Sequence, residues 1–204
     1  MDFLTAKPLS DTIYDTLFKA EKELIIISPY IQISGYLREN VFKQHLNNPK
    51  LHIIIAFDKY KDDNTFGFRG SGLEYFLNFP NLTLVYIPQL NAKYYANERQ
   101  LVTTSMSLLS YPLINSIDFG VFAEKSFNIV GKNNFYETSK NTVMSVIDSG
   151  YTVFAKRPLY SKKLLGLSKA YAGSAVYLNL LDDVIANRSI QAVRYSSLIS
   201  EIGR

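Results

Sequence analysis

The chain has 204 residues, of which 47% are hydrophobic and 20% charged, so it has an ordinary globular composition and enough length to bury a substantial core. The absence of cysteine excludes disulfides, thiolate metal sites and a cysteine nucleophile, and two scattered histidines argue against a zinc site. No apolar stretch approaches the roughly 20 residues that cross a bilayer, and the N-terminus lacks a signal-peptide pattern, so we expect a cytoplasmic protein without membrane contact, metal or cofactor.

The first half of the chain predicts helices and strands in alternation. Ser10 is expected to cap a helix over residues 11–21, and the β-branched run ELIIISPY at 23–30 predicts a strand buried on both faces. The pattern then predicts a helical segment at 36–46, a buried strand at 51–57, a short helix at 71–78 and a strand at 82–87. This alternation predicts an α/β fold with a mixed β-sheet flanked by helices.

The second half predicts a hairpin and then less regular structure. Two strands over 92–97 and 100–105 are expected around a turn at Asn97 and Glu98. A strand at 117–123, a helix at 134–147 ended by Gly150, one further strand at 175–180 and a short helix after it complete the expected elements. We therefore expect a domain over residues 1–150 and an extension over 151–204 that packs on it or on a partner.

The positive charge is concentrated in that extension. The net charge is +4, and residues 151–204 contain eight Lys or Arg against three Asp or Glu, which leaves 14 against 15 in the first 150 residues. Residues 156–169 contain no acidic residue and five basic ones. These five are the candidates for nucleic-acid binding: Lys156, Arg157, Lys162, Lys163 and Lys169. The alternative interpretation is a solvated surface that binds nothing.

The segment NAKYYANERQLVTTSMS, residues 91–107, carries an ordered set of polar side chains. Lys93 is followed five residues later by Glu98, and Thr104 and Ser105 come after a second strand. This spacing resembles the phospholipase D superfamily, whose signature is H-x-K, an acid five residues after the lysine, and a G/T-S-x-N element. The resemblance covers residues 10–130 and implies the phospholipase D-like fold, a mixed sheet flanked by helices.

The segment departs from the signature where the chemistry is most demanding. Asn91 stands in place of the histidine, Ser107 in place of the asparagine, and Asn115 with Asp118 resembles a downstream N-x-x-E/D-F-G-V stretch. In intact members the histidine is the nucleophile, and the lysine with the serine or asparagine holds the phosphate oxygens. A carboxamide neither attacks phosphorus usefully nor titrates near neutral pH. The candidate site therefore consists of Asn91, Lys93, Glu98, Ser105, Ser107 and Asp118.

Because the chain has one copy of the signature, the resemblance also implies a homodimer that joins two copies across a two-fold axis. The leading hypothesis is a catalytically degenerate protein that binds nucleic acid or a protein partner through a retained phosphate site and the basic tail. The second hypothesis is a metal-independent phosphodiesterase or nuclease whose histidine was changed to Asn91. A purely structural alternative leaves Lys93 solvated, uses Ser105 to satisfy the backbone and pairs Glu98 with Arg99 or Lys93.

Overall fold

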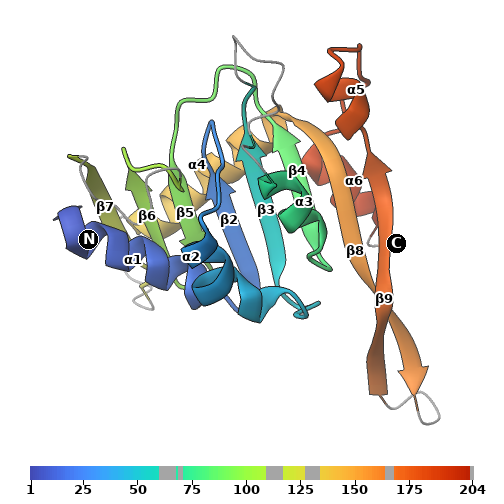
Figure 1. Ribbon diagram of the computed structural model, residues 1–204, viewed down its shortest axis with the longest axis horizontal. Coiled ribbons are helices and arrows are strands. Elements are labelled where there is room, and N and C mark those ends of the chain that lie inside the picture. Colours follow the sequence, from blue (N-terminus) through green and yellow to red (C-terminus); the bar gives the residue numbers. More distant parts are fainter. Residues whose placement is uncertain (60–67, 69–70, 109–116, 127–133, 164–167, 203–204) are drawn as a thin grey trace.

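The computed structural model describes residues 1–59, 68, 71–108, 117–126, 134–163 and 168–202. In this part of the chain, nine strands form one sheet in the order β1-β7-β6-β5-β2-β3-β4-β8-β9 (Figure 1). The strands are β1 (Asp2–Thr5), β2 (Glu23–Ile27), β3 (His52–Phe57), β4 (Leu82–Tyr86), β5 (Tyr94–Asn97), β6 (Gln100–Thr104), β7 (Phe119–Glu124), β8 (Tyr151–Lys163) and β9 (Ser168–Asn179). The pairs β2–β3 and β3–β4 are parallel and the other pairs antiparallel, so the sheet is mixed, as the sequence predicts.

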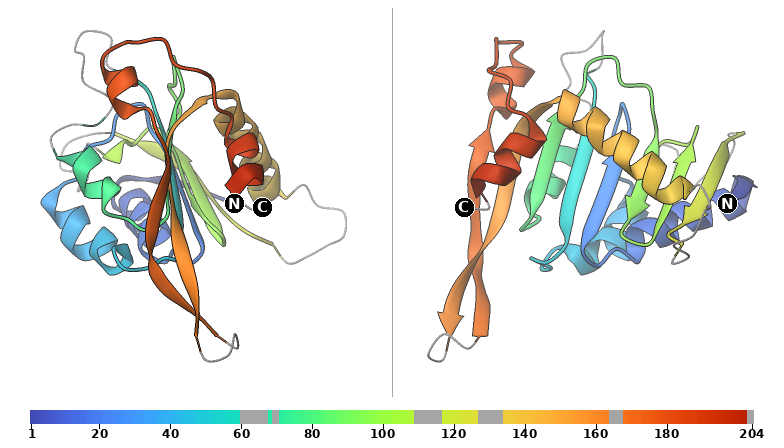
Figure 2. Two further views of the ribbon diagram at one scale, coloured as in Figure 1. Left: turned by 90° about the vertical axis from the view of Figure 1, so that its right-hand side faces the viewer. Right: turned by 180° about the vertical axis from the view of Figure 1, so that it is seen from behind.

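Helices cover both faces of the sheet (Figure 2). One face carries α1 (Ala6–Phe18), α2 (Gly35–Leu37) with the π-helical turn Arg38–Phe42 and the 3-10 turn Lys43–His45 that continue it, and α3 (Gly72–Leu77). The other face carries α4 (Phe135–Ser149) and α6 (Tyr195–Ile202), and the short α5 (Leu181–Ile185) lies at one end of the sheet. None of the described helices has the length and apolar character that a membrane crossing requires.

The central strand β2 is buried on both of its faces. Leu24 and Ile26 belong to the apolar cluster under α1, whereas Ile25 and Ile27 belong to the cluster under α4. Successive side chains of a strand point to opposite faces, so an uninterrupted isoleucine run supplies both clusters. This explains why the run ELIIISPY lacks the polar alternation of a half-exposed strand.

The chain order of the strands brings one connection across the carboxyl ends of the parallel strands. Because β5 pairs with β2 and not with β4, residues 87–93 must cross the ends of β3 and β2, about 14 Å at the usual strand spacing (Figure 1). Gln89 in this connection has a φ of 62°, the left-handed conformation that a sharp change of direction requires. Residues 91–93 therefore lie at the carboxyl edge of the sheet.

The predicted start of the first helix is wrong. The helix begins at Ala6, and Ser10 lies inside it with its hydroxyl donating to the carbonyl of Lys7 at 3.0 Å. Pro8 occupies the first turn, where a missing backbone N–H costs nothing, so the helix extends to the N-terminal side of the expected cap.

The last fifty residues are more regular than expected. The predicted strand at 175–180 is the end of β9, whereas the sequence pattern does not predict the preceding β8. The first residues of β8 pair with β4 as far as Lys156, which lies opposite Leu82, so residues 151–156 extend the sheet past residue 150. Pro158 comes just after this point, where one side of the strand no longer has a neighbour and a missing N–H is tolerated.

A buried polar cluster fastens β8 to the sheet. The guanidinium of Arg157 donates to the carbonyl of Leu82 at 3.0 Å and to the hydroxyl of Thr83 at 2.7 Å, and its side chain is buried. The ring of His52 lies 2.9 Å from the same hydroxyl and stacks on Tyr195. Burial, together with the positive charge of Arg157, lowers the pKa of His52 to about 3.

This cluster predicts a pH-dependent stability that a His52→Gln variant removes. The folded pKa lies below the ordinary value of 6.5, so the stabilisation is present above pH 6.5 and is lost as the pH falls toward about 3. We expect the free energy of unfolding of the native chain, relative to the variant, to fall by roughly 3–5 kcal/mol over this range. Urea unfolding at several pH values measures it, and parallel pH profiles for the two proteins would contradict it.

Candidate functional site

Asn91 and Lys93 lie at the carboxyl edge of the sheet, directly before β5. Asn91 is exposed and Lys93 is half-buried. The carbonyl of Lys93 accepts a hydrogen bond from the backbone N–H of Thr104 at 3.1 Å, which continues the β5–β6 ladder by one residue. The hairpin therefore brings the end of β6, and Ser105 after it, beside Lys93.

Ser105 and Asp118 are held together at this same edge. The Ser105 hydroxyl donates to a carboxylate oxygen of Asp118 at 2.7 Å and accepts from the backbone N–H of Phe119 at 3.0 Å. The backbone N–H of Ser105 also donates to the carbonyl of Phe119 at 3.0 Å. A serine has one hydroxyl proton, and here that proton is directed to Asp118, so a phosphate oxygen would compete with a carboxylate for it.

Thr104 and Ser107 complete the predicted G/T-S-x-N element. The Thr104 hydroxyl donates to the carbonyl of Phe119 at 2.7 Å and accepts from the backbone N–H of Met106 at 3.0 Å, so it serves the local turn. Ser107 is half-buried and follows two residues after Ser105. Asn115, the other residue of the downstream stretch, lies outside the described residues.

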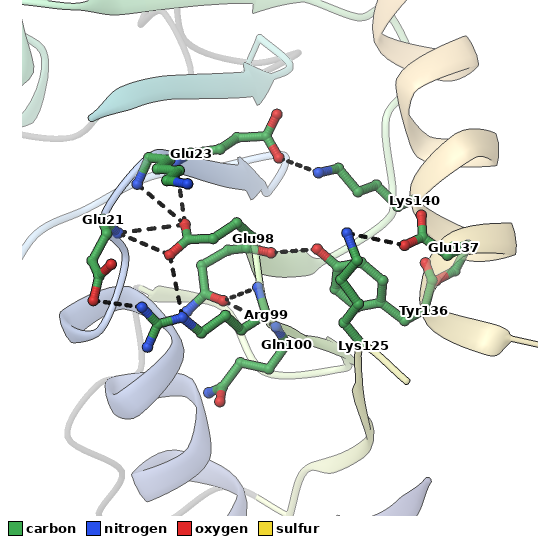
Figure 3. Close-up of polar contacts among 12 residues, drawn as sticks. Glu21, Glu23, Glu98, Arg99, Gln100, Lys125, Tyr136, Glu137 and Lys140 are labelled. Carbon is green, nitrogen blue, oxygen red and sulfur yellow. Dashed lines mark hydrogen bonds and ion pairs between the residues drawn. The ribbon is translucent and has the colours of Figure 1, made fainter. Parts of the chain in front are cut away.

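Glu98 lies at the other end of the hairpin. The four residues of β5 lie between it and Lys93, and the five residue steps amount to about 16 Å along the strand. Its carboxylate accepts hydrogen bonds from the backbone N–H groups of Glu21, Lys22 and Glu23 at 3.2–3.4 Å (Figure 3). Glu98 therefore binds the turn between α1 and β2 and is not brought together with Asn91 or Ser105.

The protonation of Glu98 reflects these contacts. Burial alone raises the pKa of the Glu98 carboxyl, but the hydrogen bonds from the backbone N–H groups outweigh it and hold the pKa below the ordinary 4.5. The exposed Arg99 is 3.8 Å from the same carboxylate and pairs more closely, at 2.6 Å, with Glu21. The pairing with Arg99 in the structural alternative is thus a minor contact beside the backbone contacts.

The turn next to Glu98 depends on a residue that the motif does not contain. Asn97 is fully buried, donates to the carbonyl of Thr16 at 2.9 Å and accepts from the backbone N–H groups of Arg99 and Gln100. The backbone carbonyl of Asn97 accepts a hydrogen bond from the Tyr136 hydroxyl at 2.7 Å, and this bond connects α4 to the hairpin (Figure 3). An asparagine directly before a turn is the sequence signal for this role, because its side chain reproduces a backbone turn.

Neither histidine is near Asn91. His52 is the first residue of β3, at the amino end of the parallel strands, and His45 is buried with its ring nitrogen 3.2 Å from the carbonyl of Leu17 at the end of α1. Burial lowers the pKa of His45, as it does for His52. The imidazoles of this chain are thus structural and do not take the place of the missing histidine within one protomer.

Four of the five basic candidates fall into two groups. Lys156 donates to the carbonyl of Leu77 at 2.9 Å, and Arg157 serves the buried cluster described above, so both side chains hold β8 in place. Lys162 and Lys169 are exposed and lie opposite each other near the far end of β8 and β9. Lys163 occupies the last position of β8. In the described part of the chain, no three His, Cys, Asp or Glu side chains gather to hold a metal ion.

Two solved structures share the arrangement of the sheet and helices. NucT from Helicobacter pylori superposes with a TM-score of 0.52 at 10% sequence identity, over 73% of this chain and 98% of NucT. Nuc from Salmonella typhimurium, a phospholipase D family member, superposes with a TM-score of 0.50 at 11% identity, over 74% of this chain and 97% of Nuc. The chain has a phospholipase D-like fold.

The fold that the spacing of residues 91–107 implies is therefore confirmed. No protein-family model matches the sequence, and no curated protein matches it either. At 10–11% identity the likeness concerns the phospholipase D-like fold alone.

A Glu98→Gln variant tests whether Glu98 stabilises the fold. Loss of the carboxylate weakens the bonds from Glu21, Lys22 and Glu23, so we expect the free energy of unfolding at pH 7 to fall by about 1–2 kcal/mol. The folded pKa is depressed, so the stabilisation is present above pH 4.5 and disappears as the pH falls further.

The matched control for this measurement is Glu21→Gln, which removes an exposed ion pair with Arg99 and should change stability by less than about 1 kcal/mol. Chemical unfolding of the three proteins at pH 7 and pH 4 measures both effects. Equal decreases in the free energy of unfolding of the two variants at pH 7 would show that Glu98 contributes no more to stability than a surface charge does.

Proposed function

We propose that this protein binds phosphodiesters, with nucleic acid as the ligand, at the carboxyl edge formed by Asn91, Lys93 and Ser105, and that it does not hydrolyse them. The observation that carries the proposal is the position of Lys93, a half-buried cation beside the end of β6, with a carboxamide two residues before it. A lysine ammonium suits a phosphate oxygen as a point charge, and the Asn91 amide can donate a further hydrogen bond.

The absence of turnover follows from the chemistry of position 91. The amide of Asn91 is neither a nucleophile nor a titrating acid, and His45 and His52 lie toward the other end of the sheet. The Ser105 proton is held by Asp118 at 2.7 Å, so the remaining groups bind an anion without activating a nucleophile. Binding and catalysis are thus separable at this site.

The proposed assembly is a homodimer. One chain supplies one copy of the segment 91–107, and a two-fold axis would bring the two Lys93 side chains to one phosphodiester. The exposed Lys162 and Lys169 supply a second region of positive charge on each protomer. A protein partner in a larger assembly is the other ligand class that a binding surface of this kind would serve.

A Lys93→Ala variant tests the phosphate site, with a fluorescein-labelled dinucleotide as a probe too short to reach residues 156–169. Loss of a charge-assisted contact should weaken binding by about 10-fold or more. Lys43→Ala is the control, because it also removes one lysine but lies on the face of the sheet that carries α1, where it pairs with Glu39. Anisotropy titrations of the three proteins measure the affinities, and equal binding by Lys93→Ala and the native chain would overturn the proposal.

The second candidate function is a metal-independent phosphodiesterase with a substituted histidine. It is favoured by one observation, the exposure of Asn91 at the edge that also holds Lys93 and Ser105. Restoring histidine with Asn91→His, and assaying DNA and RNA cleavage with EDTA present, separates the two functions. We expect no cleavage, since Ser107 replaces an oxygen-holding asparagine of the signature; cleavage by the variant would establish the phosphodiesterase in place of the binding protein.

A further inference from the structure

Strands β8 and β9 continue far beyond the rest of the sheet as a two-stranded arm. Pairing with β4 ends at Lys156, whereas β8 and β9 stay paired as far as Lys163 and Ser168. The seven residues after Lys156 extend the arm by about 23 Å. Figures 1 and 2 show the arm leaving the end of the sheet at which β4 begins, which is opposite the carboxyl edge.

The arm carries positive charge without compensation. Residues 151–180 contain five Lys or Arg and no Asp or Glu. The side chains of Lys156 and Arg157 are committed to carbonyl groups at the base of the arm. Lys162 and Lys169 lie directly opposite each other across the two strands and are exposed. Like charges in such a pair repel each other, and a bound anion removes the repulsion.

An aromatic pair lies next to the lysine pair. Tyr160 and Tyr171 face each other across the strands with ring centroids 6.4 Å apart, and both are nearly half exposed, at 46% and 45%. Side chains two residues apart on a strand share a face, so this pair and the pair of Lys162 and Lys169 lie on the same side of the arm. The arm thus presents two cations and two hydroxyl-bearing rings on one narrow surface.

We propose that this arm lies in the major groove of a B-form DNA duplex, where Lys162 and Lys169 contact phosphates. The inference rests on the nucleic-acid part of the proposed function and names both the surface and the form of the ligand. A major groove about 12 Å wide admits a two-stranded ribbon, whereas the major groove of duplex RNA is too narrow for side chains to read. The positive charge of the arm complements the negative charge of the phosphate backbone.

The arm and the carboxyl edge are separate binding surfaces. Lys93 lies at the carboxyl end of the parallel strands, and the arm projects from their amino end, so a dinucleotide at Lys93 does not reach Lys162. A longer duplex has the length to contact the arm independently of Lys93. The two surfaces can therefore be disabled one at a time.

The test compares the native chain with Lys162→Gln/Lys169→Gln by anisotropy, using a labelled 24-base-pair DNA duplex at several salt concentrations. We expect the variant to bind about 10-fold more weakly or worse, with the slope of log affinity against log salt reduced by about 1.8 for two lost phosphate contacts. The control Lys7→Gln/Lys43→Gln removes the same charge from exposed lysines on the face that carries α1, and its affinity should stay within about twofold of the native value.

Other probes decide between ligands. The native chain should bind the duplex more tightly than its single strand or an RNA duplex of the same sequence, and should not bind vesicles of phosphatidylserine. Equal affinity of the arm variant and the native chain for the duplex, equal affinity of the native chain for all three nucleic acids, or binding to vesicles but not to the duplex would each overturn the proposal. A midpoint temperature of thermal unfolding that is at or above that of the native chain shows that the substitutions leave the fold of the variant intact.

The two proposals fail in distinguishable ways. If Lys93→Ala keeps its affinity for the dinucleotide while the arm variant loses affinity for the duplex, the proposed phosphate site is wrong and the proposed role of the arm is supported. If Lys93→Ala loses affinity for the dinucleotide while the arm variant keeps its affinity for the duplex, the proposed role of the arm is wrong and the proposed phosphate site is supported.

Discussion

The position of β2 between a parallel and an antiparallel neighbour is the constraint on which the rest of the structure depends. Because β5 pairs with β2 on the side away from β3, the chain that leaves β4 must cross the carboxyl ends of β3 and β2 before β5 begins. That crossing places Asn91 and Lys93 at the edge where open sheets bind ligands. The isoleucines of β2 make the arrangement stable by filling both apolar clusters at once.

The hairpin explains which parts of the site could be predicted. The sequence pattern predicts β5 and β6 as paired strands around a turn, and this pairing puts Lys93 and Ser105 at the same end of the hairpin. The same pairing sends Glu98 to the opposite end, because four strand residues intervene. Spacing within a signature groups residues by their order in the chain, whereas a strand separates them in space.

The sequence pattern does not predict three other features of the structure, and each has a physical reason. The base of β8 is buried against β4 and its far half is exposed on both faces, so neither a continuous apolar run nor a regular alternation marks the strand. The bond between Ser105 and Asp118 joins residues thirteen positions apart, and only the pairing of β6 with β7 brings them within 2.7 Å. Arg157 resembles the other basic residues of its segment, yet its guanidinium is buried.

The way in which β8 is fastened has a consequence for how the molecule can change. The contacts of Lys156 and Arg157 lie at the base of the arm, and Ser174 donates from the returning strand to the carbonyl of Pro80. Beyond that level the Tyr160 hydroxyl donates to the carbonyl of Pro49 at 3.5 Å, which is at the distance limit of a hydrogen bond. The described residues beyond this level, 159–162 and 169–173, add no side chain to the two apolar clusters. A chain shortened to a tight turn beyond Pro158 would therefore keep both apolar clusters, the pairing of β8 with β4 and the carboxyl edge, as a protein does when a surface insertion is removed.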